Sequence, residues 1–292
     1  MEFQDIEFGM EHIATHGKVL NIHETTRLKA GLAKLKVFEG ASSVFFWGKI
    51  FGATESYYIA YLLTDGDFEF PSKKFYWSNS SFEFAELPVL SENDTGRVLS
   101  FYDEIDAPFT GVPDRRLGTK PGDEVEEEEP PPPEEEGEDA PPRPPPPLKL
   151  TEVHRLSVVV SQIEKDTAAV PRGAYRLDEG HKVNPAFAFR GLMQKEALKL
   201  SSWVHFRPPT NVDKLRALTN DNVQFHSDFM DPIDLDLPGG SWCVRTNSAG
   251  DGVYLRSLLW PGYAAFHVAQ SRYFGGCYLG NGDKRRDLPF LL

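Results

Sequence analysis

The segment over residues 121–147 limits what this chain can fold into more than any other feature. It alternates blocks of glutamate with blocks of proline and holds almost no apolar side chain. Such a stretch has little to bury against the entropy cost of ordering, its like charges repel, and its prolines favour extended polyproline II. We therefore predict a disordered, acidic, proline-rich insertion over residues 117–150, between an N-terminal lobe, residues 1–116, and a C-terminal lobe, residues 151–292.

Two roles for this insertion are open. It can be a tolerated surface loop, because long insertions between structured parts cost little stability. It can also recruit a partner, because polyproline-binding domains recognise such tracts, although the flanking glutamates would require a basic groove. The second role would make the chain a cytosolic adaptor that recruits a polyproline-binding partner through the 121–147 tract.

Charge and hydropathy narrow the class of protein. The net charge is −13, and residues 120–149 hold 11 acidic and 3 basic side chains, so the remainder is nearly balanced. An acidic chain is a poor candidate for binding nucleic acid through its phosphates. The first residues are acidic where a secretory signal would be basic, and no apolar run approaches the roughly 20 residues that span a bilayer. We expect a cytoplasmic protein that binds neither nucleic acid nor membrane, with Cys243 and Cys277 as buried thiols.

Helical periodicity appears at four places. Leucines recur after the capping candidates Thr25 and Thr26, and apolar residues recur behind Thr151 until about Lys165. Good helix formers fill residues 192–201, and residues 212–218 form a shorter candidate. The apolar positions that carry the first two helices are Leu28, Leu32 and Leu35, then Val153, Leu156, Val159, Val160 and Ile163.

Strand signals occur in both halves. Residues 44–51 and 57–63 are β-branched and aromatic around a short turn segment, which predicts a hairpin. Both faces of this hairpin are apolar, although a sheet with one wet face would alternate, so either this chain or a partner subunit must cover the second face. Further strand candidates are residues 73–77, 82–85, 241–246, 253–259, 263–268 and 273–279.

The last four of these candidates predict an antiparallel meander. Because helices and antiparallel strands occur without repeated βαβ spacing, the sequence predicts an α+β fold. We expect two lobes of antiparallel β-hairpins and meander with packed helices, interrupted by the disordered loop.

No combination of residues points to an enzyme. His12 and His16 have a helical spacing, but the glutamate and third ligand of a metalloprotease motif are missing. The aspartates near Pro232 lack the spacing of an EF-hand and are interpreted as a solvated turn. These aspartates are Asp228, Asp231, Asp234 and Asp236. We predict no catalytic residue, no cofactor and no metal site.

Nine short segments match, in order, the pattern of a known family. They lie at residues 46–50, 57–60, 171–174, 200–202, 228–231, 240–242, 255–262, 278–284 and 287–290. With them the chain resembles the radial spoke head protein 9 family, and part of the signal is shared with spoke head proteins 4 and 6. The acidic proline-rich segment is not part of that pattern.

The resemblance implies a non-enzymatic structural subunit of the radial spoke head in the axoneme of motile cilia and flagella. Such a subunit would support spoke head assembly and mechanical signalling between the central apparatus and dyneins. The implied partners are spoke head proteins 4 and 6 and other spoke head subunits, with a transient contact to the central apparatus.

Large apolar side chains of the two hairpins are the candidate site residues. They either form the core of each lobe or dock the chain against spoke head proteins 4 and 6, because large aromatics bury much area at little entropic cost. The candidates are Phe45, Trp47, Tyr57, Tyr58, Trp242, Leu258 and Trp260.

Overall fold

The computed structural model describes residues 1–66, 68–101, 107–118, 149–218 and 228–291. The proline-rich tract that the sequence predicts to be disordered lies outside these residues.

Helices and strands are distributed over both halves of the chain. The helices are α1 (Ile6–Ala14), α2 (Ile22–Phe38), α3 (Glu92–Ser100), α5 (Glu152–Thr167), α6 (Gln194–Ala197) and α7 (Val212–Leu218). The strands of the N-terminal half are β1 (Val44–Ile50), β2 (Tyr57–Thr64), β3 (Ser72–Ser78) and β4 (Ala85–Glu86). Those of the C-terminal half are β5 (Ala169–Pro171), β6 (Tyr175–Leu177), β7 (Val183–Pro185), β8 (Trp203–His205), β9 (Trp242–Thr246), β10 (Gly252–Ser257), β11 (Tyr263–Val268) and β12 (Phe274–Gly280).

One eight-stranded sheet forms the centre of the molecule, in the order β4-β3-β2-β1-β12-β11-β10-β9. The predicted hairpin is β1–β2, and the predicted meander is β9 to β12. Every neighbouring pair is antiparallel except β1 and β12, which run parallel. The mostly antiparallel sheet with packed helices confirms the α+β prediction. The division into lobes 1–116 and 151–292 stays a prediction, and the strands of both parts join in this sheet.

The parallel pairing of β1 with β12 is the seam between the two halves. It is short, joining Gly48 to Tyr278 and Ile50 to Gly280 at its ends. The two backbones approach so closely at Gly48 that a Cβ there would lie 2.2 Å from the carbonyl oxygen of Tyr278. Only glycine fits at such an approach. Trp47, just before it, is the extra residue of a β-bulge in the β1–β2 pairing.

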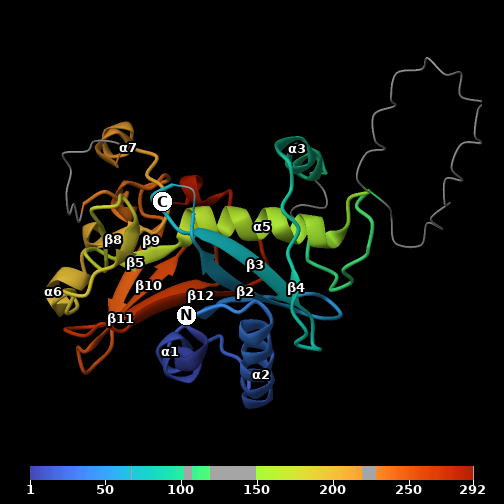
Figure 1. Ribbon diagram of the computed structural model, residues 1–292, viewed down its shortest axis with the longest axis horizontal. Helices are drawn as coiled ribbons and strands as arrows, with labels where there is room; N and C mark the ends of the chain where they lie inside the picture. The colour runs from blue at the N-terminus through green and yellow to red at the C-terminus, as the bar shows by residue number, and fades with distance from the viewer. Residues whose placement is uncertain (67, 102–106, 119–148, 219–227, 292) are drawn as a thin grey trace, which may run out of the picture.

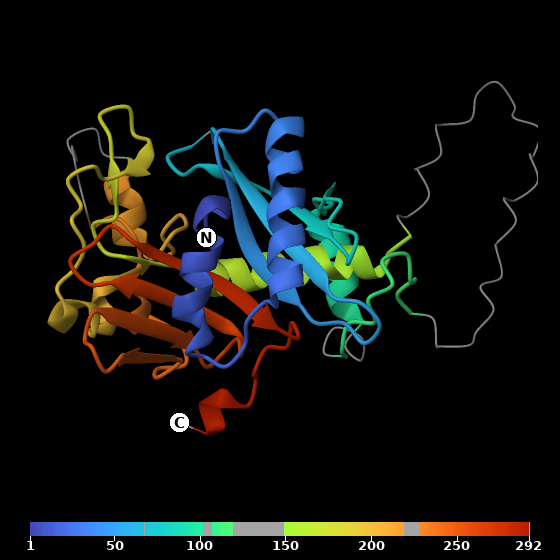
Figure 2. The same cartoon turned by 90° about the horizontal axis from the view of Figure 1, so that it is seen from below.

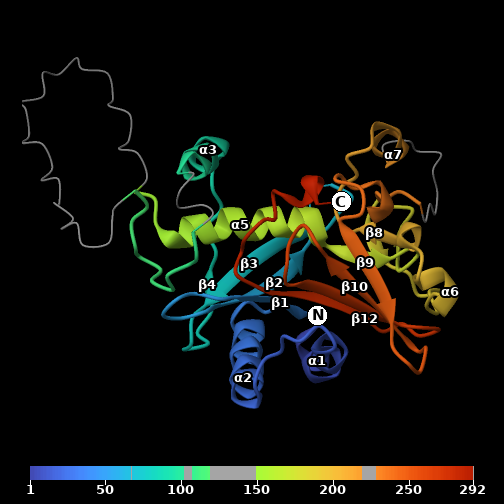
Figure 3. The same ribbon diagram turned by 180° about the vertical axis from the view of Figure 1, so that it is seen from behind.

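Helices cover the sheet on both faces. Figure 1 shows α5 along one face and α1 and α2 against the other, and Figure 3 shows the same layers from behind. Trp47, Ile50 and Tyr57 belong to the cluster that contains α5, whereas Phe46 and Tyr58 belong to the cluster that contains α1 and α2. The chain itself therefore covers both apolar faces of the first hairpin, which decides between the two sources of cover that the sequence left open.

Most predicted helices have close counterparts. Helix α7 has the predicted bounds, and α5 begins after Thr151 and continues to Thr167. Helix α2 starts earlier than predicted, because Asn21 is its N-cap, and the Glu24 side chain accepts a hydrogen bond in return from the Asn21 N–H at 2.9 Å. Thr25 and Thr26 instead bond carbonyls one turn back.

Two predicted elements are shorter in the structure. The helix expected over residues 192–201 is a single turn, α6, followed by a 3₁₀ turn, because the chain becomes extended at Lys199 to lead into β8. The strand expected over residues 82–85 is replaced by the two residues of β4, which overlaps it only at Ala85, since the positive φ of 59° at Phe82 excludes an extended conformation where that strand was to begin.

Candidate functional site

Helix α5 carries three carboxylates that receive hydrogen bonds from the sheet and from the loops beside it. They are Glu152 in its first turn and Glu164 and Asp166 in its last turns. A buried carboxylate is tolerated only where donors compensate for its lost hydration, so these contacts mark where the helix is fixed to the rest of the molecule.

Glu152 is 1% exposed and accepts four hydrogen bonds. The Tyr57 hydroxyl donates at 2.7 Å, the Gly111 N–H at 2.8 Å, and the N–H and hydroxyl of Thr110 at 3.1 and 2.6 Å. The guanidinium of Arg115 lies 3.9 Å away. Burial, together with the Glu152 acceptor, raises the pKa of Tyr57 well above its usual range. Glu152 therefore joins α5 to β2 and to the loop before the helix.

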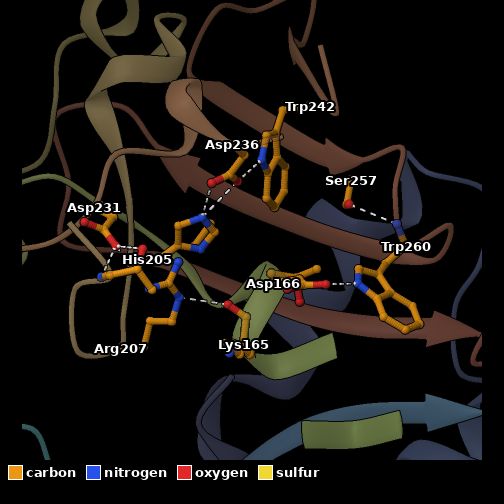
Figure 4. A network of polar contacts seen from close by, with 12 residues as sticks. Lys165, Asp166, His205, Arg207, Asp231, Asp236, Trp242, Ser257 and Trp260 are labelled. Carbon is orange, nitrogen blue, oxygen red and sulfur yellow. Dashed lines mark hydrogen bonds and ion pairs between the residues drawn. The ribbon is translucent and has the colours of Figure 1, made fainter. Parts of the chain in front are cut away.

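At the other end of α5, Glu164 and Asp166 each accept a hydrogen bond from one indole N–H and form an ion pair with one lysine. Trp47 Nε1 donates to Glu164 at 2.8 Å, and Lys73 forms a short ion pair with the same carboxylate. Trp260 Nε1 donates to Asp166 at 2.8 Å (Figure 4), and Lys284 pairs with it at 2.8 Å. Because Trp47 lies in β1 and Trp260 in the turn between β10 and β11, these neighbouring carboxylates hold both halves of the sheet to one helix end.

A histidine and a carboxylate lie beside this helix end. His205 is 1% exposed, and its Nε2 lies 2.9 Å from both carboxylate oxygens of Asp236. Trp242 Nε1 donates to the same carboxylate at 2.7 Å (Figure 4). Among the described residues, His205 Nδ1 has no hydrogen-bond partner. A cavity of about 80 Å³, which Ser241 and Ser257 also line, adjoins the pair.

This pair does not have the arrangement of a serine hydrolase. Nucleophilic catalysis requires a serine within hydrogen-bond reach of the histidine that activates it. Here Ser257 Oγ accepts the N–H of Trp260 at 3.1 Å, and within the described portion no serine hydroxyl bonds His205. The histidine instead links β8 to the segment before β9.

Asp231 corrects one interpretation of the sequence. The aspartates near Pro232 were expected to form a solvated turn, yet Asp231 is 8% exposed and Asp236 bonds His205. Burial opposes ionisation of Asp231, but hydrogen bonds from the Thr210 N–H and hydroxyl, with the charge of Arg207, outweigh it and lower the pKa. Arg207 Nε also donates to the Lys165 carbonyl at 2.9 Å, near the end of α5 (Figure 4).

The structure places five of the seven candidate side chains in the core. Trp47, Tyr57 and Tyr58 of the first hairpin are buried, as are Trp242 and Trp260 of the second. The Tyr58 hydroxyl donates to Glu24 of α2 at 2.8 Å.

The other two candidates, Phe45 and Leu258, are half-buried. The ring of Phe45 stacks on Tyr61 at 5.0 Å between centroids. A docking role for any of the seven stays a prediction.

Sequence reasoning missed the carboxylates that hold the aromatic side chains. One signal was available, because Glu164 and Asp166 lie at the C-terminal end of a helix, where the macrodipole disfavours negative charge. Two acidic residues at that position indicate partners from elsewhere. Glu152 gave no such signal, because an acidic residue in a first turn is ordinary.

These contacts attach helix α5 to both halves of the sheet. Among the residues that the structure describes, no group of three or more His, Cys, Asp or Glu side chains is placed to hold a metal ion. Both cysteines are free, and burial raises the pKa of the Cys277 thiol to about 12, whereas Cys243 is half-buried. Every helix in the described ranges is too short or too polar to cross a bilayer.

Comparison with known proteins identifies the family. No family model matches the chain. Three relatives named radial spoke head protein 9 homolog align over all 292 residues and over their own full length, with 32% identity for the protein of Danio rerio and 31% for those of Bos taurus and Homo sapiens. The chain belongs to the radial spoke head protein 9 family.

Family membership confirms the resemblance seen in the short sequence segments. A member of the radial spoke head protein 9 family is a component of the radial spoke head, which lies in the axoneme of cilia and flagella, and it associates with other spoke head subunits.

Proposed function

We propose that this chain is a non-enzymatic structural subunit of the radial spoke head. It binds spoke head proteins 4 and 6, supports assembly of the head, and transmits mechanical signals between the central apparatus and the dyneins. The observation that carries the proposal is the joint attachment of Trp47 and Trp260 to the end of α5, in a protein of the radial spoke head protein 9 family.

Force transmission requires a body that does not deform under load. The sheet is continuous from β4 to β9, and both of its faces are packed against helices. Close-packed interiors have low compressibility and transmit strain. The carboxylate contacts of α5 oppose sliding of one half of the sheet against the other, so a load applied to either half is shared.

The proposal is tested in cells that lack the native protein. The full chain is expressed there, axonemes are isolated, and spoke heads are extracted and captured through a tag on this chain. Co-purification of spoke head proteins 4 and 6, together with restored beating, is the expected result. Recovery of the chain alone from the cytosol, with spoke heads assembled without it, would contradict the proposal. So would metabolite turnover by the pure protein that is lost on changing one titratable side chain.

A second candidate function is the adaptor role, favoured by the proline and glutamate blocks of residues 121–147. Deleting that tract from the full chain separates the two functions. If the shortened chain still enters spoke heads, the tract is not the main recruiting element. If it folds but fails to assemble, the adaptor role is supported.

A further inference from the structure

A pocket of about 270 Å³ lies between the end of α1 and the turn that connects β10 to β11. Figure 2 shows α1 crossing the strands of the C-terminal half, with the chain continuing toward α2 beside them. The walls include the apolar side chains of Ile13, Leu258 and Pro261. The turn belongs to the segment over residues 255–262 that the sequence marks as characteristic. Of that segment, Trp260 donates the hydrogen bond to Asp166 of α5 described above.

The ionisable side chains at the mouth of the pocket are mostly basic. His16, Lys18, Arg256 and Arg285 line it, and no aspartate or glutamate does. Arg256 donates a hydrogen bond to the His16 carbonyl at 3.3 Å, and Lys18 lies over the ring of Phe51. Within the described residues, none of Lys18, Arg256 and Arg285 forms an ion pair with a carboxylate.

Several other lysines of the chain are neutralised by a nearby carboxylate. Lys49, Lys73 and Lys284, for instance, each pair with a carboxylate, at 2.8 Å in the case of Lys284. The pocket therefore gathers uncompensated positive charge on a chain whose net charge is −13. Such a local concentration attracts anionic groups and raises their local concentration.

The pKa of His16 is affected by the same positive charges. Burial lowers its pKa first, and the charges of Arg256 and Arg245 lower it further. No acidic side chain is among the groups that act on it.

We propose that this pocket binds an acidic segment of a partner polypeptide, with a glutamate or aspartate carboxylate between Lys18, Arg256 and Arg285 and neighbouring apolar side chains against Leu258 and Pro261. Guanidinium groups match carboxylates geometrically, which favours this pairing. The apolar walls fit a peptide better than a bare anion. A long polyanion such as nucleic acid would meet the negative charge of the rest of the molecule, which disfavours it.

The experiment uses the full chain and a fluorescent peptide in which glutamate alternates with leucine. Binding is followed by fluorescence anisotropy at low salt, and the same peptide with glutamine in place of glutamate is the matched probe. We expect the glutamate peptide to bind at least about tenfold more tightly, because each charge-assisted hydrogen bond contributes about that factor or more.

Two paired variants locate the binding site. Lys18 and Arg285 are exposed, so Lys18→Gln/Arg285→Gln removes two pocket charges with little effect on folding. Lys34→Gln/Lys199→Gln changes the net charge equally at exposed positions away from the pocket. The pocket variant is expected to bind the glutamate peptide about tenfold more weakly or worse, and the control variant to bind like the unchanged protein.

Each outcome decides the matter. Equal weakening by both variants would mean that net charge alone attracts the peptide, and the proposal would be wrong. Equal affinity for the glutamine peptide would also overturn it, and so would displacement of the peptide by an equimolar amount of inorganic phosphate or a short DNA duplex. The anisotropy measurement uses the purified chain, so its result does not depend on spoke head assembly. Incorporation of the same pocket variant into spoke heads is measured separately, by capture from axonemes as described above.

Discussion

Removing the buried carboxylate of Glu152 should destabilise the protein more than removing any exposed carboxylate. In Glu152→Ala, four hydrogen-bond donors lose their acceptor. The Tyr57 hydroxyl and the Gly111 N–H are buried, whereas the groups of Thr110 are half-buried. An unsatisfied buried donor costs about 1–3 kcal/mol, so the two buried donors together lower the free energy of unfolding by about 4 kcal/mol.

Two further variants calibrate this figure. Glu152→Gln keeps one acceptor oxygen but replaces the other with a donor, so about half of the loss is expected. Glu11→Ala removes an exposed glutamate of α1. Glu11 forms no ion pair with any described residue. Because alanine is at least as good a helix former as glutamate, this control should change stability by less than about 0.5 kcal/mol.

Urea unfolding followed by tryptophan fluorescence measures all three variants. With a slope of about 3 kcal/mol per molar urea, the Glu152→Ala midpoint should fall by more than about 1 M. The reasoning would be refuted if Glu152→Ala and Glu11→Ala shifted the midpoint equally, since the contacts of Glu152 would then contribute nothing beyond a surface residue.

Three other predictions concern the seam and the contacts near α5. Trp47→Phe keeps a buried aromatic side chain but replaces the indole with a smaller phenyl ring and removes the N–H that bonds Glu164, so urea unfolding should show a loss of at least about 2 kcal/mol, whereas a loss near zero would mean that the bond is not formed in solution. Gly48→Ala would force a Cβ against the Tyr278 carbonyl, so the melting temperature should drop by an amount equivalent to about 3 kcal/mol, and an unchanged value would contradict the close approach. The folded-state pKa of Asp231 is lowered, so its contribution is present above the unfolded pKa of about 3.9 and is lost as pH falls through the folded value. Asp231→Asn should therefore lower the melting temperature at pH 7 and flatten its decline in acid, and parallel pH profiles for variant and parent would count against this.

Local sequence patterns predicted the longest strands and helix α5 well because those elements depend on neighbouring residues, whereas α1, α3 and the short strands β5 to β8 were not predicted. The β1–β2 hairpin and the four-stranded meander follow from β-branched and aromatic runs around turn residues, and α5 follows from its apolar spacing. The apolar character of both faces of β1 also indicated correctly that something covers each face. Each of these features depends on a short segment of the sequence.

The seam between β1 and β12 had no such local signal. The paired residues are more than two hundred positions apart in the sequence, as Gly48 and Tyr278 are. The residue pattern of one strand does not indicate which other strand it will pair with. The same limit applies to the contact between Trp47 and Glu164. Each residue was visible in the sequence, but their pairing depends on packing between distant segments.

The position of β12 in the sheet has a consequence for how the protein is made. The edge of β1 that pairs with β12 receives its neighbour from a strand synthesised more than two hundred residues later. Until then that edge has unpaired backbone groups that can associate with other nascent chains. Premature termination before β12 would leave the edge open permanently, so we expect even late truncations to give aggregation-prone products.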